Sequence, residues 1–305
     1  MGKQKTWVAA FLLLILPLSL FAQAPMSEEA EDDPAQDFLL SICTTPTAQL
    51  IPAPAFCLAP FPSTPVPSEK FTFRSWSHDF LHDAGEIWSY PVHIRTRDIL
   101  PIAGLAVLTG LLIGNDETIR RGFMDYRSSH AWVRAASPVI TGMGTYGAWG
   151  TAAAFLCVGL IAKDDKAVET ATLAASAMLQ SGILVMVLKG LAGRQRPLFA
   201  DGVDRWSGPI GFFKRFGSGQ YGKYDSFPGG HSITAFTLAT VLAMQYRESG
   251  WVPILAYTLA TGVALSRVTE GRHWLSDCLV GGVLGHLIGR LVVLNHRRRH
   301  SAAVM

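Results

Sequence analysis

Two stretches of this sequence bring together residue types that bind an anion. The first runs from Lys189 through Gly-Leu-Ala-Gly-Arg-Gln to Arg196 and a proline, so the two cations are seven residues apart. That spacing is about two helical turns, so both side chains would lie on one face of a continuing helix. The second is a proline followed by Gly229, Gly230, His231 and a serine. If a helix begins there, its free N–H groups form an anion site with the imidazole of His231 beside it.

A third stretch adds a candidate nucleophile. Ser266 and Arg267 are followed after five residues by His273, and after three more by Asp277. Residues four apart are neighbours on a helix, so the Asp277 carboxylate can hydrogen-bond one ring nitrogen of His273 and leave the other unprotonated. Three cations, two histidines and one carboxylate are what phosphoryl transfer to a protein nucleophile requires, because it needs charge neutralisation, an in-line nucleophile and an acid.

The three stretches resemble the motifs K-x6-R-P, P-S-G-H and S-R-x5-H-x3-D of the type-2 phosphatidic acid phosphatase (PAP2) superfamily, in its membrane-associated lipid phosphatase branch. The first and third match at every specified position, whereas Gly229 stands where the family usually has serine. Ser226 or Ser232 could replace that hydroxyl, or phosphate binding could be weaker by about 1 kcal/mol. The resemblance covers Lys189 to Asp277 and the flanking apolar segments.

The resemblance implies three catalytic residues and five phosphate-binding residues. His273 would form a phosphohistidine, Asp277 would orient it, and His231 would protonate the leaving oxygen and then activate water. The phosphate would be bound by Lys189, Arg196, Arg267, Gly229 and Gly230. No metal and no other cofactor is implied.

Taken singly, these residues have plainer interpretations. Lysines and arginines are common at the ends of membrane helices, where they reach toward the headgroups. Asp201 and Asp204 lack companion ligands at metal-binding spacing, and His286 lies on an apolar segment without an acidic neighbour. The combined spacing of the three motifs favours a catalytic role for the motif residues, but not for Asp201, Asp204 or His286.

The composition indicates a membrane protein. Hydrophobic residues make up 49% of the 305 residues and charged residues only 16%, which is too little charge for an ordinary soluble surface. The net charge of +3 is dispersed except for Arg297–Arg299, so no nucleic-acid partner is expected. The four cysteines have no C-x-x-C pairing and do not indicate structural zinc, while a disulfide between Cys43 and Cys57 is left open.

The N-terminal third is organised differently from the rest. Residues 1–24 have two lysines, an apolar stretch and Ala-Gln-Ala, which is typical of a signal peptide, although Pro25 after the cleavage point also allows an uncleaved anchor. Residues 25–70 are acidic and then Pro-rich, which predicts a flexible, disordered linker. Residues 71–98 mix aromatic and charged side chains and predict an amphipathic interfacial segment.

Apolar segments in residues 99–294 predict an all-α membrane bundle of about six helices that forms the PAP2-like phosphatase domain. The expected helices are 99–114, 137–162, 167–188, 231–247, 251–267 and 275–294. Gly281, Gly285 and Gly289 recur at the spacing that lets neighbouring helices approach closely. Residues 295–305 form a basic tail.

The basic tail predicts a cytoplasmic C-terminus, and the motifs then face the periplasm or exterior of a bacterial-type inner membrane. Counting back through six spans puts Arg95–Asp98 in the cytoplasm, whereas a cleaved signal peptide would leave that segment outside. We favour a first segment that does not fully cross, over a misread leader or a bundle with fewer crossings.

The leading hypothesis is hydrolysis of a phosphomonoester or diphosphate on a lipid, with membrane lipids as the surrounding partners. A broad-specificity periplasmic acid phosphatase is a second hypothesis, which the many apolar segments disfavour. A vanadium-dependent haloperoxidase is a third, because vanadate imitates phosphate. A non-enzymatic transporter or scaffold is a fourth.

Overall fold

The computed structural model describes residues 72–200, 206–217 and 222–302. Within these ranges the chain is helical apart from connections and one isolated bridge between Arg194 and Trp206, which confirms the expected all-α class. The α-helices are α3 (Phe73–Ser89), α4 (Thr96–Ser129), α5 (Ala131–Gly142), α6 (Ala148–Ala162), α7 (Asp165–Ala192), α8 (Gly208–Gly217), α9 (Gly230–Gln245), α10 (Trp251–Thr269) and α11 (Leu275–Ala302). Shorter helical pieces are η1 (Tyr90–Val92), η2 (Met143–Gly147) and η3 (Pro197–Phe199).

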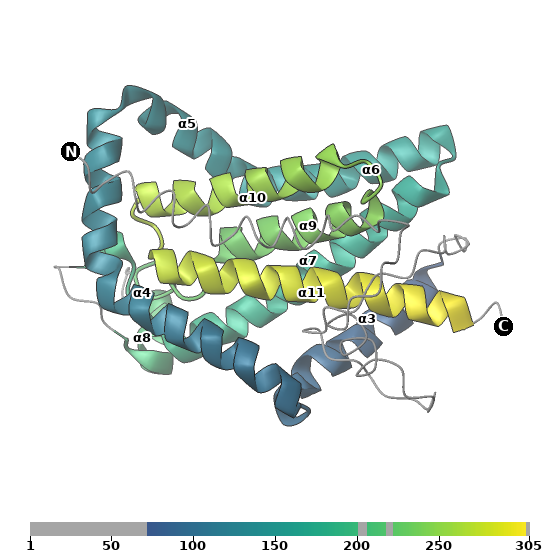
Figure 1. Ribbon diagram of the computed structural model, residues 1–305, viewed down its shortest axis with the longest axis horizontal. Helices are drawn as coiled ribbons and strands as arrows, with labels where there is room; N and C mark the ends of the chain where they lie inside the picture. Colours follow the sequence, from purple (N-terminus) through teal and green to yellow (C-terminus); the bar gives the residue numbers. More distant parts are fainter. Residues whose placement is uncertain (1–71, 201–205, 218–221, 303–305) are drawn as a thin grey trace, which may run out of the picture.

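Helix α9 lies in the middle of the bundle and packs against α7, α10 and α11 (Figure 1). The approach of α11 is close because glycines occupy its contact face. A Cβ added at Gly281 would lie 2.5 Å from the carbonyl oxygen of Gly229, and Gly285 and Gly289 likewise face backbone atoms of α9. The close approach expected from the glycine spacing is confirmed.

Helix α4 is longer than the sequence predicted. The segment 99–114 was expected to end before a polar stretch, whereas α4 has 34 residues and continues well beyond it. The helix tolerates the polar residues because Asp116 is buried against other elements and Glu117 pairs with Arg120 at 2.7 Å and Arg121 at 3.0 Å. At this length α4 is one of the helices that are long and apolar enough to cross a membrane.

The other expected helices are present with shifted ends. The segment 137–162 begins earlier, as α5, and continues through a π-helical turn at Met143–Gly147 into α6. Helix α8 lies between the expected segments 167–188 and 231–247 and was not predicted. The segments 167–188, 231–247, 251–267 and 275–294 correspond to α7, α9, α10 and α11.

Helix α3 is held to the bundle by polar contacts rather than by an apolar face alone. Asn295 donates to Asp83 at 2.9 Å, Arg299 donates to the same carboxylate at 3.0 Å, and Gln180 donates to the carbonyl oxygen of Phe80 at 2.7 Å. Helix α3 therefore lies beside the C-terminal half of α11, at the end of the bundle that carries the basic residues (Figure 1).

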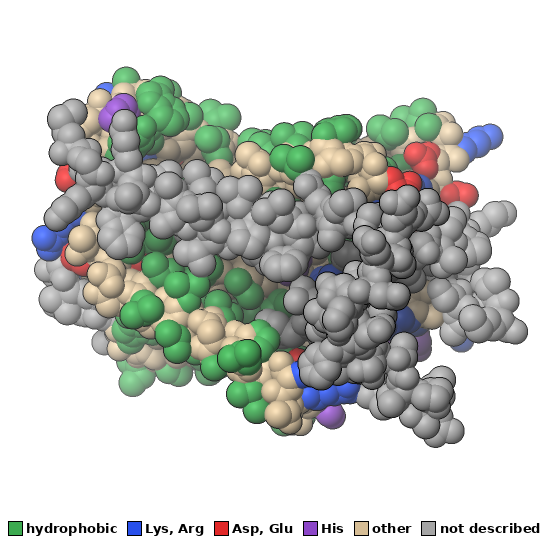
Figure 2. Space-filling view, in the orientation of Figure 1, with side chains coloured by type: hydrophobic (Ala, Val, Ile, Leu, Met, Phe, Trp, Pro, Cys, Tyr) green, Lys and Arg blue, Asp and Glu red, His purple; other side chains and the backbone are tan. Residues whose placement is uncertain are grey.

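Five helical stretches among the described residues are long and apolar enough to cross a membrane: Thr96–Ser129, Ala131–Ala162, Asp165–Ala192, Trp251–Thr269 and Leu275–Arg299. Hydrophobic side chains cover much of the visible outer surface of α4, α5 and α6 (Figure 2). An outer surface of this kind is what hydrocarbon would contact. The residues assigned to the leader (1–24) and the linker (25–70), together with Asp201 and Asp204, lie outside the described residues.

Candidate active site

The predicted site residues lie together at one end of the bundle, where α7 and α10 end and α9 and α11 begin (Figure 1). Lys189 is in the last turn of α7 and Arg267 is in the last turn of α10. Gly229 is the N-cap of α9, so Gly230 and His231 are its first two residues. Several long-range hydrogen bonds join these helix ends.

His273 is buried, with 1% of its surface exposed, in the short connection before α11. Its Nδ1 lies 2.7 Å from the carbonyl oxygen of Ser226. A carbonyl only accepts hydrogen bonds, so Nδ1 carries the proton and Nε2 keeps its lone pair. Burial, reinforced by the charges of Arg196 and Lys189, holds the pKa of His273 well below its usual value. The imidazole is therefore neutral and ready to act as a nucleophile.

Asp277 does not make the hydrogen bond to His273 that helical spacing suggested. Its Oδ2 is 3.8 Å from Nδ1, because His273 precedes the helix whose first turn contains Asp277. The same oxygen accepts from the N–H of Trp274 at 2.9 Å and from the hydroxyl of Ser226 at 2.5 Å. The Asp277 carboxylate therefore holds Ser226 in place, and the carbonyl of Ser226 orients the ring of His273. The negative charge of Asp277 also acts on the ring directly from 3.8 Å.

The three cations of the motifs are held by acidic partners. Asp225 lies 2.7 Å from the Arg196 Nε and 3.9 Å from the Lys189 Nζ. Although burial opposes ionisation, the two cations lower the pKa of Asp225 to about 2, so it stays charged. Arg267 pairs with Glu270 at 2.8 Å, while its buried Nε has no hydrogen-bond partner among the described residues. Charge and an unused donor therefore remain available for an anion.

The glycine-rich turn is tightly packed against α11. The N–H of Gly229 donates to the carbonyl oxygen of Asp277 at 2.9 Å, which fixes the start of α9 beside the start of α11. A Cβ at Gly230 would lie 3.6 Å from the Lys189 Nζ, so the free N–H groups of α9 begin next to that cation. Burial, followed by the charges of Arg267 and Lys189, lowers the pKa of His231 to about 3.

Four residues of this region were not assigned a role from the sequence. Asp116, Arg194, Asp225 and Ser226 are buried and connect the motif residues. Ser226 was considered only as a replacement for the missing serine hydroxyl, but its hydroxyl is hydrogen-bonded to Asp277. The sequence held a clue to two of the others, since Arg194 lies inside the first motif and Asp116 interrupts an apolar segment.

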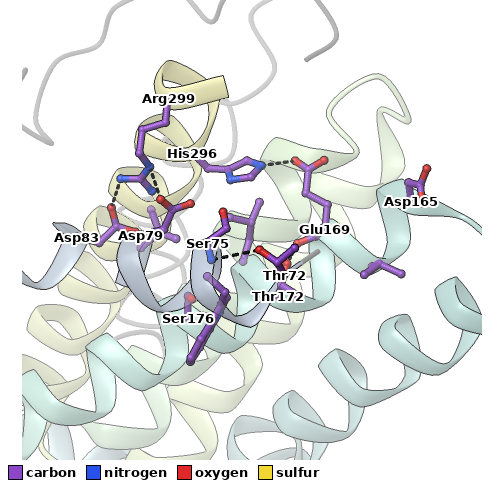
Figure 3. A pocket seen from close by; sticks show the side chains of 14 residues that line it. Thr72, Ser75, Asp79, Asp83, Asp165, Glu169, Thr172, Ser176, His296 and Arg299 are labelled. Carbon is purple, nitrogen blue, oxygen red and sulfur yellow. Dashed lines mark hydrogen bonds and ion pairs between the residues drawn. The ribbon is translucent and has the colours of Figure 1, made fainter. Parts of the chain in front are cut away.

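No group of three or more His, Cys, Asp or Glu residues in the part of the chain that the structure describes could hold a metal ion. A separate cavity of about 80 Å³ lies between α3, α7 and α11, at the other end of the bundle (Figure 3). Its charged groups are already paired: Arg299 lies 3.0 Å from both Asp79 and Asp83, and His296 lies 3.3 Å from Glu169. None of the motif residues lines this cavity, so it is distinct from the anion site.

Parts of this chain are similar to proteins that are named as phosphatases. Over 68 residues, 22% of this chain, it is 41% identical to a lipid A 1-phosphatase of Porphyromonas gingivalis and covers 15% of that protein. Over 67 residues, also 22% of this chain, it is 42% identical to YbjG of Escherichia coli, a protein named for undecaprenyl-diphosphatase activity, and covers 32% of it. The chain thus spans less than a third of the length of either relative.

A crystal structure of a PAP2-type phosphatidylglycerolphosphate phosphatase from Bacillus subtilis is 22% identical, with a TM-score of 0.44 over 74% of this chain and 96% of that one. The model of the PAP2 superfamily matches residues 170–301, a range that contains all three motifs. Over these residues, which make up less than half of the chain, the protein resembles the PAP2 superfamily.

Proposed function

We propose that this protein is a metal-independent lipid phosphatase that hydrolyses a phosphomonoester or diphosphate through a phosphohistidine on His273. One observation carries the proposal: the Nδ1 of a fully buried, neutral His273 is tied to a carbonyl oxygen at 2.7 Å. Its Nε2 therefore holds a lone pair near the positive charges of Lys189, Arg196 and Arg267. The match of residues 170–301 to the PAP2 superfamily supports the same conclusion.

In the first step, the His273 Nε2 attacks phosphorus and the bond from phosphorus to the leaving oxygen breaks. His231 donates a proton to that oxygen, so that the departing group is an alcohol rather than an alkoxide or, from a diphosphate, a lipid monophosphate that carries one negative charge fewer. The ring of His273 becomes a cationic phosphohistidine, whose Nδ1–H remains bonded to the Ser226 carbonyl. The Asp277 carboxylate, 3.8 Å away, stabilises the new positive charge.

In the second step, water attacks phosphorus, the N–P bond breaks, and His231 accepts the proton from water. Inorganic phosphate then leaves and His273 is neutral again. The pKa of His231 is low because burial and the charges of three cations oppose its protonation. A bound phosphate dianion offsets those cations, so substrate itself makes His231 a proton donor.

The substrate is proposed to be a lipid because the site sits at the end of apolar helices. Trp206, Ile210 and Phe213 are exposed on and beside α8, which follows the first motif. Such side chains suit the headgroup zone, where an acyl or isoprenyl chain approaches. The two curated relatives are named for a lipid A phosphate and an undecaprenyl diphosphate, which supports the same class.

We also propose that the site faces the exterior of the inner membrane and that the C-terminus is cytoplasmic. The motifs and the basic residues occupy opposite ends of α11, which has 28 residues and is thus about 42 Å long, enough to cross the hydrocarbon (Figure 1). Helix α3 lies at the basic end. The position of α3 favours a topology with six membrane crossings, in which Arg95–Asp98 lie in the cytoplasm. In that topology the N-terminal leader is not a cleaved signal peptide.

The decisive experiment measures phosphate release from a panel of lipid phosphates in detergent with EDTA present. The parent is compared with His273→Ala and His231→Ala, and with His78→Ala as a control, because the His78 side chain is 77% exposed and far from the motifs. We expect EDTA-resistant, vanadate-sensitive activity that falls by at least about 10³-fold in His273→Ala and about 10²-fold in His231→Ala.

A second readout tests the intermediate. Substrate labelled on the phosphoryl group and quenched in alkali should leave label on the parent and on His231→Ala, but not on His273→Ala. Loss of activity with EDTA, or a His273→Ala variant with more than a tenth of the parental rate, would contradict the proposal. Halide oxidation with vanadate and no phosphate release would instead identify a haloperoxidase.

A further inference from the structure

A buried ionic network lies behind the anion site and reaches outside the three motifs. Arg194, which is fully buried, donates to the Asp277 Oδ1 at 2.6 Å and to the Asp116 Oδ2 at 2.9 Å. It also donates to the hydroxyl of Ser276 at 2.7 Å, and that hydroxyl and the N–H of Ser276 both donate to Asp116. The network therefore joins α4, the connection after α7 and the first turn of α11.

The two carboxylates share one guanidinium, so the network carries a net negative charge in an interior where charge is costly. Asp116 and Asp277 are 2% and 0% exposed. Trp206 and Trp274 complete the surroundings, with ring centres 4.7 and 5.3 Å from the guanidinium carbon of Arg194. A packing role alone does not require this charge, since apolar side chains of similar size often stabilise a core as well or better.

The contacts continue from the network to the nucleophile. The Asp277 Oδ2 accepts from the hydroxyl of Ser226, whose N–H donates to the carbonyl oxygen of Arg194 at 3.0 Å. The carbonyl of Ser226 in turn accepts from the His273 Nδ1 at 2.7 Å. Arg194 thus restrains Ser226 from two sides, through its own backbone and through Asp277.

We propose that Asp116 and Arg194 are positioning residues that set the orientation of His273 and the negative charge facing it. The proposal rests on the proposed role of His273 as nucleophile. When His273 is phosphorylated its ring becomes cationic, and the Asp277 Oδ2 lies 3.8 Å from its Nδ1. Arg194 offsets part of that carboxylate's charge, and Asp116 offsets part of the charge of Arg194.

Two substitutions should therefore act in opposite electrostatic directions. Asp116→Asn removes a negative charge and makes protonation of His273 harder, whereas Arg194→Gln removes a positive charge and makes it easier. The other charged or titratable groups that face His273 are unchanged in both variants: Lys189, Arg196, Asp225, His231, Arg267 and Asp277. A network that served only to pack the helices would not produce opposite shifts.

The test measures kcat, KM and the pH profile of kcat/KM for phosphate release by the full chain in detergent. Glu117→Gln is the matched control, because Glu117 follows Asp116 in the sequence but its ion pairs among the described residues are with Arg120 and Arg121, outside the network. We expect Asp116→Asn and Arg194→Gln to lower kcat by about 10- to 100-fold with KM within about threefold. The acid limb should rise by about one pH unit in Arg194→Gln and stay at or below that of the parent in Asp116→Asn.

Parental kcat in Asp116→Asn, or acid limbs that move in the same direction, would overturn the inference. If Asp116→Asn cannot be purified, Arg194→Lys decides, since it keeps the charge but loses the planar fork that bridges two carboxylates. Unchanged kcat in Arg194→Lys would then refute the positioning role. Activity that survives His273→Ala would refute the proposed function itself, which keeps the two failures distinct.

Discussion

Restoring the family's serine at position 229 should reduce activity rather than improve it. A Cβ at Gly229 would lie 3.1 Å from the carbonyl oxygen of Asp277 and 3.3 Å from the Cα of Cys278. These neighbours are backbone atoms of α11 and cannot rotate away. A side chain here must therefore push the first turn of α11 by a few tenths of an ångström, and that turn carries the carboxylate that holds Ser226.

The expected size follows from two opposing effects. Adding atoms to a well-packed position typically costs about 1–3 kcal/mol, whereas a neutral hydrogen bond from the serine hydroxyl to phosphate contributes about 1 kcal/mol. The net loss for Gly229→Ser is therefore at most about 2 kcal/mol, or roughly 30-fold in kcat/KM. Gly229→Ala has the same crowding without the hydroxyl, so it should be about fivefold worse than Gly229→Ser.

The assay compares kcat/KM for a lipid phosphate in detergent among the parent, Gly229→Ser and Gly229→Ala, with thermal unfolding of each as a check on folding. The expected order is parent, then serine, then alanine. If Gly229→Ser were several-fold more active than the parent, the pocket would have room for the side chain and the packing argument would be wrong. Parental activity in Gly229→Ala would show that this contact does not constrain the site.

Four further predictions concern stability, phosphate binding and pH. Gly285→Ala should lower Tm strongly, because the added Cβ would collide with the backbone oxygen of Ile233. Gly150→Ala should leave Tm unchanged or raise it, because no atom lies within 4 Å of the added Cβ. Equal changes in Tm would contradict the close packing of α11 against α9. Asp225→Asn should bind inorganic phosphate about tenfold more tightly, measured by product inhibition, because a competing carboxylate is lost. The pKa of Asp225 is lowered to about 2, so its ionised form contributes about 2 kcal/mol to the free energy of unfolding. This contribution is present above about pH 4 and is lost as the pH falls toward 2. The free energy of unfolding should therefore depend less on pH over this range in Asp225→Asn. Because the pKa of His273 is well below its usual value, kcat/KM at about pH 5 should remain close to its value at neutral pH. A fall in kcat/KM centred near pH 6.5 would show that His273 is not already neutral in the free enzyme.

The sequence by itself determined the class of the fold and the membership of the site. Apolar segments of span length require helices, since a chain in hydrocarbon must satisfy its backbone hydrogen bonds internally. The three motifs lie where apolar segments stop, so their residues were expected at helix ends, and Lys189, His231 and His273 do lie together there. Glycines at a four-residue interval likewise predicted the close contact of α11, because that interval places them on one helix face.

Only the tertiary structure decided which group orients His273. Helical spacing suggested Asp277, but the helix begins after His273, and a carbonyl 47 residues away accepts the Nδ1 proton instead. Arg194 lies 78 residues from Asp116, and no local pattern relates them. Spacing along one helix specifies neighbours within a turn or two, whereas contacts across helices depend on how several apolar faces pack at once. The sequence therefore predicted that the motif residues lie together, whereas packing determined the contacts among them and added Asp116, Arg194 and Asp225 to the site.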